Sequence, residues 1–274
     1  MVPSGAAVVS AAITSAGKVR RVNEDSVIER YPAFVVADGM GGHDAGDVAS
    51  GIVTEELAAL ELTGQGDVAA VKRRLAAAAH RIERLGSPGH KQAAGTTVSG
   101  VVVVMQNGEP YWLVVNLGDS RTYRMARGAL EQLSVDHSEV QELVDLGRLS
   151  PAAARHHPRR NVVTRALGAG ADGVPDYWLL PIEQGDRILV CSDGLTSEVS
   201  DTRIAAALAA HADPQRAAGT LMAAALAAGG RDNISVIVVD ALVAPTSGEA
   251  DTVESAQDLA PATRPNPAAK GHRP

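Results

Sequence analysis

Two runs rich in β-branched residues, Val98–Met105 and Tyr111–Val115, flank the pair Asn107-Gly108. Asn-Gly is a preferred pair for a two-residue hairpin turn, because both central positions of a type I′ turn need a positive φ. The two runs are therefore predicted to pair as antiparallel strands. A sheet that contains this hairpin cannot be a simple parallel one.

The other strand and helix patterns follow one another in groups. Short β-branched runs predict strands, and apolar positions that recur every three to four residues predict helices. Strands alternating with pairs of helices predict an α+β fold in which helices cover an antiparallel β-sandwich. The expected helices are Ala45–Leu62, Val68–Leu85, Asp201–His211 and Pro214–Ala228. The further expected strands are Val8–Thr14, Phe34–Ala37, Arg121–Met125, Leu130–Leu133, Asn161–Arg165, Tyr177–Leu180, Arg187–Cys191 and Asn233–Val243.

Two segments depart from the grouped pattern of strands and helices. Residues 136–160 carry a short helical pattern, a Ser-Pro pair and the adjacent His156-His157, which is typical of an insertion between strands and predicts a lid. Residues 244–274 are rich in Pro, Ala and Thr and contain no aromatic residue. Such a composition cannot bury enough apolar area to offset the entropy of ordering, so a disordered tail is predicted.

Charge and cysteine usage limit the partners and the compartment. A net charge of -7 without a Lys/Arg-rich run argues against nucleic acid as a partner. The single cysteine excludes an intrachain disulfide. The apolar stretch Gly5–Ile13 is too short to span a bilayer and lacks the basic start of a signal peptide, so we expect a cytoplasmic protein without a membrane segment.

Four predicted strands begin or end beside an aspartate that adjoins a small or turn-forming residue: Asp38, Asp119, Asp193 and Asp232. A single Asp-Gly pair is best explained as a solvated turn. Four carboxylates gathered at one rim of a sheet are not explained as solvated turns, because they repel one another. Like charges about 4 Å apart cost about 4 kcal/mol at an effective dielectric of about 20. Cations between the carboxylates would remove that cost.

Oxygen ligands without a supporting His or Cys cluster favour Mg²⁺ or Mn²⁺ over zinc. Two such ions, about 3.5–4 Å apart, lower the pKa of a bridging water and hold hydroxide in line with a phosphorus atom. In the loop after the first predicted strand, Arg20 could grip a phosphate through two parallel donors, while Glu24 and Asp25 could orient metal-bound waters. A solvated charged loop explains these three residues equally well in isolation.

Seven short motifs resemble, in the same order, those of the metal-dependent serine/threonine protein phosphatases of type 2C in their bacterial form. Any one of them is weak, but seven in order are highly specific. The motifs are VRRVNEDS (Val19–Ser26), ADGMGGH (Ala37–His43), AGTT (Ala94–Thr97), NLGDSR (Asn116–Arg121), NVVTRALG (Asn161–Gly168), SDGL (Ser192–Leu195) and RDNIS (Arg231–Ser235).

The resemblance implies a role for each matching residue. Asp38 would bridge two ions, the carbonyl of Gly39 would bind one of them, and Asp193 and Asp232 would bind the other. Glu24 and Asp25 would act through metal-bound water, Arg20 would hold the substrate phosphate, and Asp119 with Asn161 would hold a third, weaker ion. The implied catalytic domain spans residues 1–243, as a β-sandwich flanked by helix pairs with a flap at about 136–160.

One position departs from the family pattern. Eukaryotic relatives place a His directly after the Asp-Gly pair, where it can protonate the leaving alkoxide, whereas this chain has Met40. His43 would serve as the general acid only if the glycines before it turn it inward, and a metal-bound water is the alternative donor. As a whole the resemblance implies a monomeric phosphatase whose partners are phosphorylated proteins, among them serine/threonine kinases and their substrates.

Other readings of single features are weaker. Cys191 lacks the Arg six residues later that a cysteine-based phosphatase needs, because Ser197 stands there, so a small buried residue is expected. The run that starts at Gly39 lacks the third Gly of a dinucleotide fingerprint. His156-His157 diverge on an extended backbone and are expected to be solvated. Two other functions stay open: a phosphatase of a regulator in a partner-switching pathway, and a non-catalytic scaffold.

Overall fold

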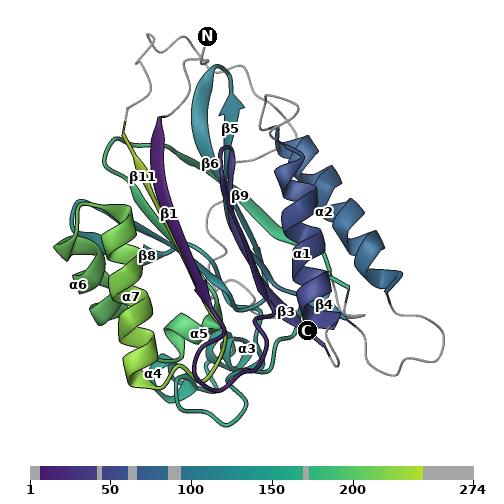
Figure 1. Cartoon of the computed structure of the whole chain (residues 1–274), viewed down its shortest axis with the longest axis vertical. Coiled ribbons are helices and arrows are strands. Elements are labelled where there is room, and N and C mark those ends of the chain that lie inside the picture. Colours follow the sequence, from purple (N-terminus) through teal and green to yellow (C-terminus); the bar gives the residue numbers. More distant parts are fainter. Residues whose placement is uncertain (1–6, 42–44, 61–66, 86–93, 169–172, 243–274) are drawn as a thin grey trace, which may run out of the picture.

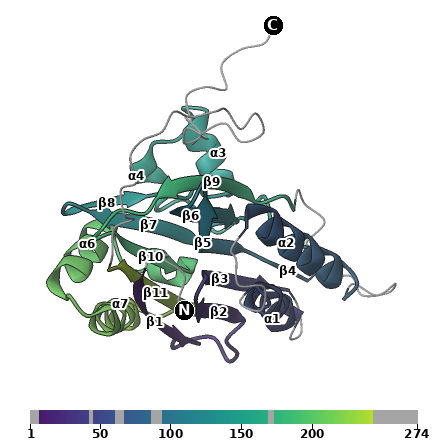
Figure 2. The ribbon, with the colours of Figure 1, turned by 90° about the horizontal axis from the view of Figure 1, so that it is seen from above.

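Two antiparallel sheets packed face to face form the centre of the protein (Figures 1 and 2). The computed structural model describes residues 7–41, 45–60, 67–85, 94–168 and 173–242. The first sheet has the order β1 (Val8–Ser15), β11 (Ile234–Ala241), β10 (Arg187–Cys191), β7 (Arg121–Ala126) and β8 (Ala129–Gln132). The second has the order β2 (Asp25–Arg30), β3 (Ala33–Met40), β5 (Val98–Gln106), β6 (Glu109–Leu117) and β9 (Asp176–Pro181), with β4 (Gly95–Thr96) paired to β3.

The hairpin predicted around Asn107-Gly108 is confirmed. β5 and β6 pair antiparallel, and both turn residues have a positive φ, 52° for Asn107 and 84° for Gly108. The turn between β7 and β8 uses the same conformation at Arg127 and Gly128. Both turns match the right-handed twist of the strands that they join.

Alternation along the strands divides the core between the layers. On β3, Phe34 and Val36 face the first sheet and pack in the core between the sheets, together with Trp112. Val35 and Ala37 point the other way, into the core beneath the helices. Because successive side chains of a strand face opposite sides, a strand buried on both faces reads as a continuous apolar run.

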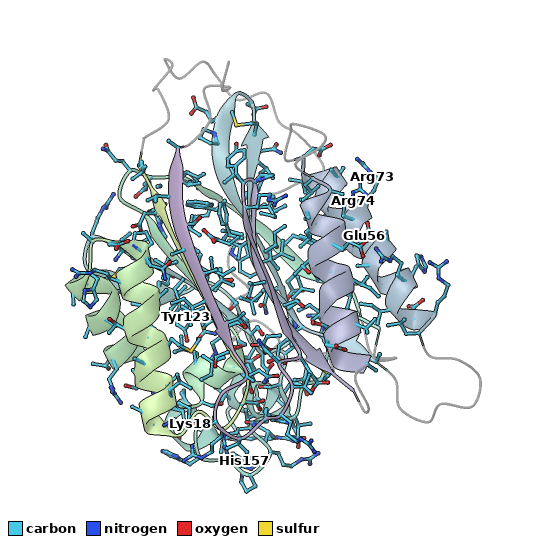
Figure 3. All side chains as sticks on the ribbon, in the orientation of Figure 1. Lys18, Glu56, Arg73, Arg74, Tyr123 and His157 are labelled. Atoms are coloured by element: carbon cyan, nitrogen blue, oxygen red, sulfur yellow. The ribbon has the colours of Figure 1, made fainter. Side chains whose placement is uncertain are left out.

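Two pairs of helices cover the outer faces of the sandwich (Figure 2). The second sheet is covered by α1 (Ala45–Ala58) and α2 (Val68–Glu83), and the first by α6 (Asp201–Ala210) and α7 (Pro214–Ala228). Ion pairs link the first two helices, since Glu56 of α1 meets Arg74 and Arg81 of α2 (Figure 3). The predicted α+β sandwich of four layers is confirmed.

The segment 136–160 lies beside the sandwich and carries two short helices, α3 (Glu139–Asp145) and α4 (Pro151–Ala154). Ser138 and Ser150 cap them by accepting hydrogen bonds from backbone N–H groups of the first turn. We call residues 136–160 the flap. No helix in the described part of the chain has both the length and the apolar character to cross a membrane.

Several predicted boundaries were wrong, because tertiary pairing overrode the local pattern. β3 continues past Ala37 to Met40, since Asp38 pairs with β2 and Gly39 with β4. The expected strand Asn161–Arg165 is absent, because only Val163 forms a bridge, with Ser138. The strand β2 and the short helix α5 (Asp193–Thr196) were not predicted. The predicted tail, residues 244–274, and His43 lie outside the described residues.

Candidate metal centre

Asp38 and Asp25 lie opposite each other at one end of the second sheet, as register partners on β3 and β2. The backbone of Asp38 is fully engaged: its N–H donates to Thr97 Oγ1 at 3.0 Å, and its C=O accepts from the N–H of Thr97 at 2.9 Å and from Thr96 Oγ1 at 3.0 Å. The backbone of Asp38 is therefore held firmly at this end of the sheet.

Asp193 and Asp232 reach the same end from the first sheet. Asp193 is the first residue of α5 and is separated from β10 by Ser192, and Asp232 is separated from β11 by Asn233. The two strands pair antiparallel, and the hydrogen bond from Ser192 N–H to Ser235 C=O, 3.1 Å, continues that pairing beyond β10. The two aspartates that the sequence separates by almost forty positions thus meet at one rim.

Asp25 joins the two sheets. Its Oδ2 accepts hydrogen bonds from Ser192 Oγ at 2.8 Å and Ser235 Oγ at 2.7 Å, both from the first sheet. Its Oδ1 is buried and accepts no hydrogen bond from a donor within the described residues. A buried carboxylate oxygen without a donor needs a cation, a proton or a water.

The electrostatics of the site favour positive charge. Burial, and then repulsion from Asp25, Asp193 and other carboxylates, raises the pKa of Asp38 well above its ordinary value. Burial raises the pKa of Asp25 to about 6. Burial and the charge of Asp136 raise the pKa of Asp119 to about 7. Each carboxylate is hard to ionise beside the others, and divalent cations between them would reverse that effect.

Arg20 lies at the rim of the site and bonds Asp232, with Nη2 2.8 Å from Oδ2. Its side chain is 54% exposed. The hydrogen bond and the charge of Asp232 raise the pKa of the guanidinium. Arg20 is therefore charged, accessible to a ligand and adjacent to the carboxylates.

Gly39 and Glu24 lie where α1 approaches β3. The N–H of Gly39 donates to the C=O of Glu24 at 3.1 Å, and a Cβ on Gly39 would overlap the backbone of Gly46 at the start of α1. Only glycine fits at this close approach. The close packing of backbone around Gly39 keeps its peptide unit at the edge of the carboxylate site.

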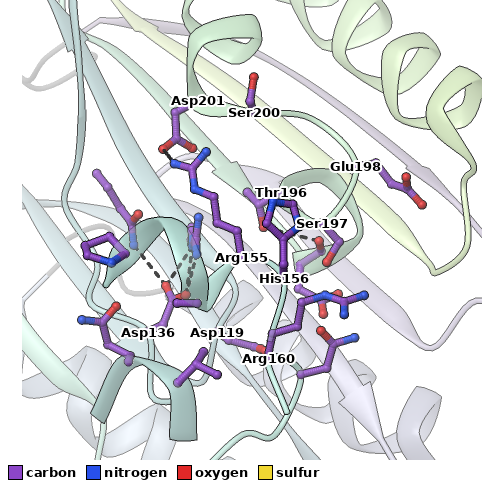
Figure 4. A pocket seen from close by; sticks show the side chains of 18 of the residues that line it. Asp119, Asp136, Arg155, His156, Arg160, Thr196, Ser197, Glu198, Ser200 and Asp201 are labelled. Atoms are coloured by element: carbon purple, nitrogen blue, oxygen red, sulfur yellow. Dashed lines mark hydrogen bonds and ion pairs between the residues drawn. The ribbon is translucent and has the colours of Figure 1, made fainter. Parts of the chain in front are cut away.

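A cleft of about 930 Å³ runs from the site to the flap (Figure 4). Asp119 and Asp193 line its inner end, and Asn161 and His156 line the flap side. Asp119 is 8% exposed. The structure thus brings the expected carboxylates together, since Asp25, Asp119, Asp193 and Asp232 all act electrostatically on Asp38. Asn161 is linked to them only as another lining residue of the same cleft.

The donor set fits hard divalent ions, because it consists of carboxylate oxygens with one orphaned oxygen among them. In the part of the chain that the structure describes, no three His, Cys, Asp or Glu side chains are arranged as a finished ligand set. One expected ligand, Asp232, is bonded to Arg20 instead of pointing freely toward the other carboxylates. A metal ion at this site would compete with Arg20 for Asp232 Oδ2.

Asn233 was given no role from the sequence, but in the structure it holds the loop of residues 16–24, which contains Arg20. Asn233 Oδ1 accepts from the N–H of Glu24 at 2.9 Å, and its Nδ2 donates to the carbonyls of Val22, at 2.9 Å, and Ala16, at 3.3 Å. The sequence offered only its place directly after Asp232 in the motif Arg231–Ser235, and its burial is visible only in the structure. Cys191 is fully buried, as predicted, and burial raises the pKa of its thiol to about 12, which makes it a poor nucleophile.

Comparison with known proteins assigns the class. The protein phosphatase 2C family model matches residues 20–229. The fold is that of the metal-dependent phosphatases of type 2C. The chain belongs to the protein phosphatase 2C family.

The proteins that it resembles include two bacterial phosphatases. The chain is 39% identical over 236 residues to the serine/threonine protein phosphatase PstP of Mycobacterium tuberculosis, which covers 84% of this chain, but it spans only 44% of the length of PstP. It is 34% identical to the serine/threonine phosphatase stp of Listeria monocytogenes, over 83% of this chain and 93% of that protein. The catalytic domain of PstP, solved in complex with two manganese ions, superposes with a TM-score of 0.75 at 37% identity, over 86% of this chain and 99% of that one.

Proposed function

We propose that this protein hydrolyses phosphoserine and phosphothreonine in other proteins, with two divalent ions bound by Asp38, Asp193 and Asp232. The observation that carries the proposal is the convergence of these carboxylates from both sheets on one rim, where burial and repulsion from neighbouring carboxylates raise the pKa values of Asp38 and Asp193. When bound, the ions would lower the pKa of a water and polarise the phosphate. The two manganese ions bound to the related PstP domain support Mn²⁺, and Mg²⁺ suits the same oxygen donors.

Each residue of the site has its own proposed role in binding the ions, the water or the substrate. Asp38 is repelled by both Asp25 and Asp193 and would be a ligand of both ions, and the adjacent Gly39 carbonyl would bind one of them. Glu24 and Asp25 would orient waters at the ions. Arg20 takes the phosphate oxygens of the substrate, because its planar fork matches them and its side chain is exposed at the rim.

Asp119 and Asn161 form a weaker third site between the sheets and the flap. The proton for the leaving alkoxide comes from His43 or from a bound water, since Met40 stands where other relatives carry a His. We assign the whole of residues 1–243 to one catalytic domain, active as a monomer in the cytoplasm on serine/threonine kinases and their substrates.

The test uses a phosphothreonine peptide with Mn²⁺ or with EDTA. We expect turnover only with the metal, and Asp38→Asn should lower kcat at least about a hundredfold, as the loss of a preorganised transition-state contact does. Arg20→Ala should raise KM about tenfold, because one charge-assisted contact with the phosphate is lost from the ground state. Arg21→Ala, which alters an exposed neighbour, is the matched control and should change neither constant. Full turnover in EDTA, or by Asp38→Asn, would refute the assignment.

A further inference from the structure

His137, at the root of the flap, contacts the residue before Asp119. We propose that His137 is a positioning residue that fixes the Asp119 loop and ties it to the flap. The proposal rests on the proposed function in one respect, the role of Asp119 in binding the third ion. His137 belongs to none of the seven motifs and is 8% exposed.

One residue holds both backbone polar groups of Gly118. The N–H of Gly118 donates to His137 Nδ1 at 3.0 Å, and the N–H of His137 donates to the C=O of Gly118 at 2.8 Å. The Nδ1 contact is buried. A ring nitrogen and a backbone donor of the same residue thus set the position and the tilt of the peptide that leads into Asp119.

Gly118 has little freedom to move away from this clamp. Its φ is +101°, and a Cβ at this position would lie 2.5 Å from Thr97 Cγ2. Thr97 in turn donates or accepts at Ser120 Oγ, 2.8 Å away, and accepts from the N–H of Asp38. Ser120, on one side of Asp119, is therefore linked through Thr97 to the strand that carries Asp38, and His137 holds Gly118 on the other side.

The far side of the imidazole is fixed as well. Nδ1 accepts a hydrogen bond from Gly118, so a neutral ring carries its proton on Nε2, which lies 3.0 Å from Asp176 Oδ2. Arg165 also bonds the Asp176 carboxylate. Arg165 Nη1 lies 2.7 Å from Nε2 too, but two donors cannot bond each other, so its hydrogen bonds go to Asp176. Asp176 thereby selects the tautomer that leaves Nδ1 free to hold Gly118.

The same residue closes the flap onto the sandwich. The C=O of His137 accepts from the N–H of Thr164 at 2.8 Å, and the N–H of Glu139 donates to the C=O of Val162 at 2.9 Å. The start and the end of the flap therefore meet at His137. A displacement of the flap root would be passed to Gly118 and so to Asp119.

A buried histidine with satisfied hydrogen bonds could also be a packing residue only, and two matched variants separate these roles. His137→Asn places an amide oxygen close to the position of Nδ1, whereas His137→Gln places the same group farther out, near the position of Nε2. Both keep a polar side chain of similar size. Only the Asn variant can continue to accept from Gly118.

The first measurement is amide hydrogen exchange of Gly118 in the metal-free protein. The second is titration with Mn²⁺ followed by calorimetry, which measures binding at the third, weakest site without turnover.

We expect His137→Gln to lower the exchange protection of the Gly118 amide about tenfold and the affinity for the third Mn²⁺ ion about tenfold. The loss of one hydrogen bond of about 1.4 kcal/mol would have this effect. The two tight sites should be unchanged, and His137→Asn should recover most of both losses. His211→Asn, at a distant histidine bonded to Thr220 Oγ1 at 3.0 Å, is the control.

Equal effects of the Asn and Gln variants, or a lowered Tm with unchanged Gly118 exchange and unchanged Mn²⁺ binding, would overturn the proposal and leave His137 a packing residue. Absence of a third Mn²⁺ in the unaltered protein would overturn it too. A protein that binds three ions but does not turn over phosphopeptide would instead refute the proposed function. In that case the exchange and titration results would still decide the role of His137.

Discussion

Asp25→Asn is expected to stabilise the metal-free protein at neutral pH. The Asp25 side chain is 6% exposed, and the two serines from the first sheet bond only one of its oxygens. Asparagine has the same shape, keeps an oxygen for Ser192 and Ser235, and carries no charge. Its amide nitrogen would replace the orphaned oxygen, on the side where the chain offers the carboxylate of Asp38 as an acceptor.

The magnitude follows from the pKa. Burial raises the pKa of Asp25 from 3.8 to about 6, although hydrogen bonds from Ser235 and Ser192 oppose the rise. The folded protein therefore holds this proton more tightly than the unfolded chain, so the stabilisation is complete below about pH 4 and is lost as the pH rises through about 6. A difference of about two pKa units corresponds to about 3 kcal/mol, an upper limit because neighbouring carboxylates share the effect. We expect a gain of about 2 kcal/mol for the variant at pH 7.5.

Urea denaturation in EDTA at pH 4.5, 6.0 and 7.5 measures this gain. The free energy of unfolding of the unaltered protein should fall across the series, and that of Asp25→Asn should fall less. Asp213→Asn, at the exposed cap of α7, is a control that removes a charge and keeps the cap, so it should have little effect. An Asn variant no more stable than the unaltered protein at pH 7.5, with the same pH slope, would refute the account of Asp25 as a buried, strained carboxylate.

Three further outcomes follow from the packing and the site. Gly39→Ala should destabilise the fold by at least about 2 kcal/mol in urea denaturation, because the added Cβ overlaps the backbone of Gly46. Asp186→Ala should cost about 3 kcal/mol by the same assay, because Arg124 keeps only its exposed partner Glu183 and Trp112 Nε1 loses its acceptor. Mn²⁺ at about a hundred times its dissociation constant should raise Tm at pH 7.5 by about 5–10 °C in a thermal scan, since binding to the native state alone adds about 2.7 kcal/mol.

Local signals predicted the parts of the fold that local chemistry decides. The Asn107-Gly108 hairpin formed as expected because its turn needs two positive φ angles that few other pairs adopt. α7 begins where Asp213 caps it and Pro214 starts it, and it stops at Gly229, so its bounds could be predicted. In the hairpin and in α7, the residues that determine the turn or the helix ends lie within the turn or at those ends.

The missed elements depend on partners far away in the chain. β2 begins inside a charged motif, and it is a strand because Asp25–Arg30 pair residue by residue with β3. The β-branched run Val162–Thr164 predicted a strand, but the flap gives it only a single bridge at Val163. Intrinsic β-propensity describes how well a residue fits a sheet surface, and it does not supply the neighbouring strand.

The candidate site shows the same division. Several aspartates at strand ends were enough to predict a carboxylate cluster at one rim of a sheet. This prediction does not require knowing which residues of neighbouring strands pair. The hydrogen bonds of Asn233 to Glu24 and Val22 span more than two hundred positions and could not be predicted from the sequence. Support for a site is therefore harder to predict than its ligands, since support depends on which loops meet.

The bond between Arg20 and Asp232 involves two residues that the proposed function uses in other ways, one for phosphate and one for a metal ion. Both side chains are partly exposed, 54% for Arg20 and 31% for Asp232. An ion pair in such a position contributes about 0–1 kcal/mol. A divalent ion shared with Asp38 and Asp193 gains more from Asp232 than a solvated guanidinium does, because those carboxylates are buried and repel one another without it. Under the proposed function an ion would therefore displace Arg20 from Asp232, and the guanidinium would stay at the rim with its donors available to the phosphate.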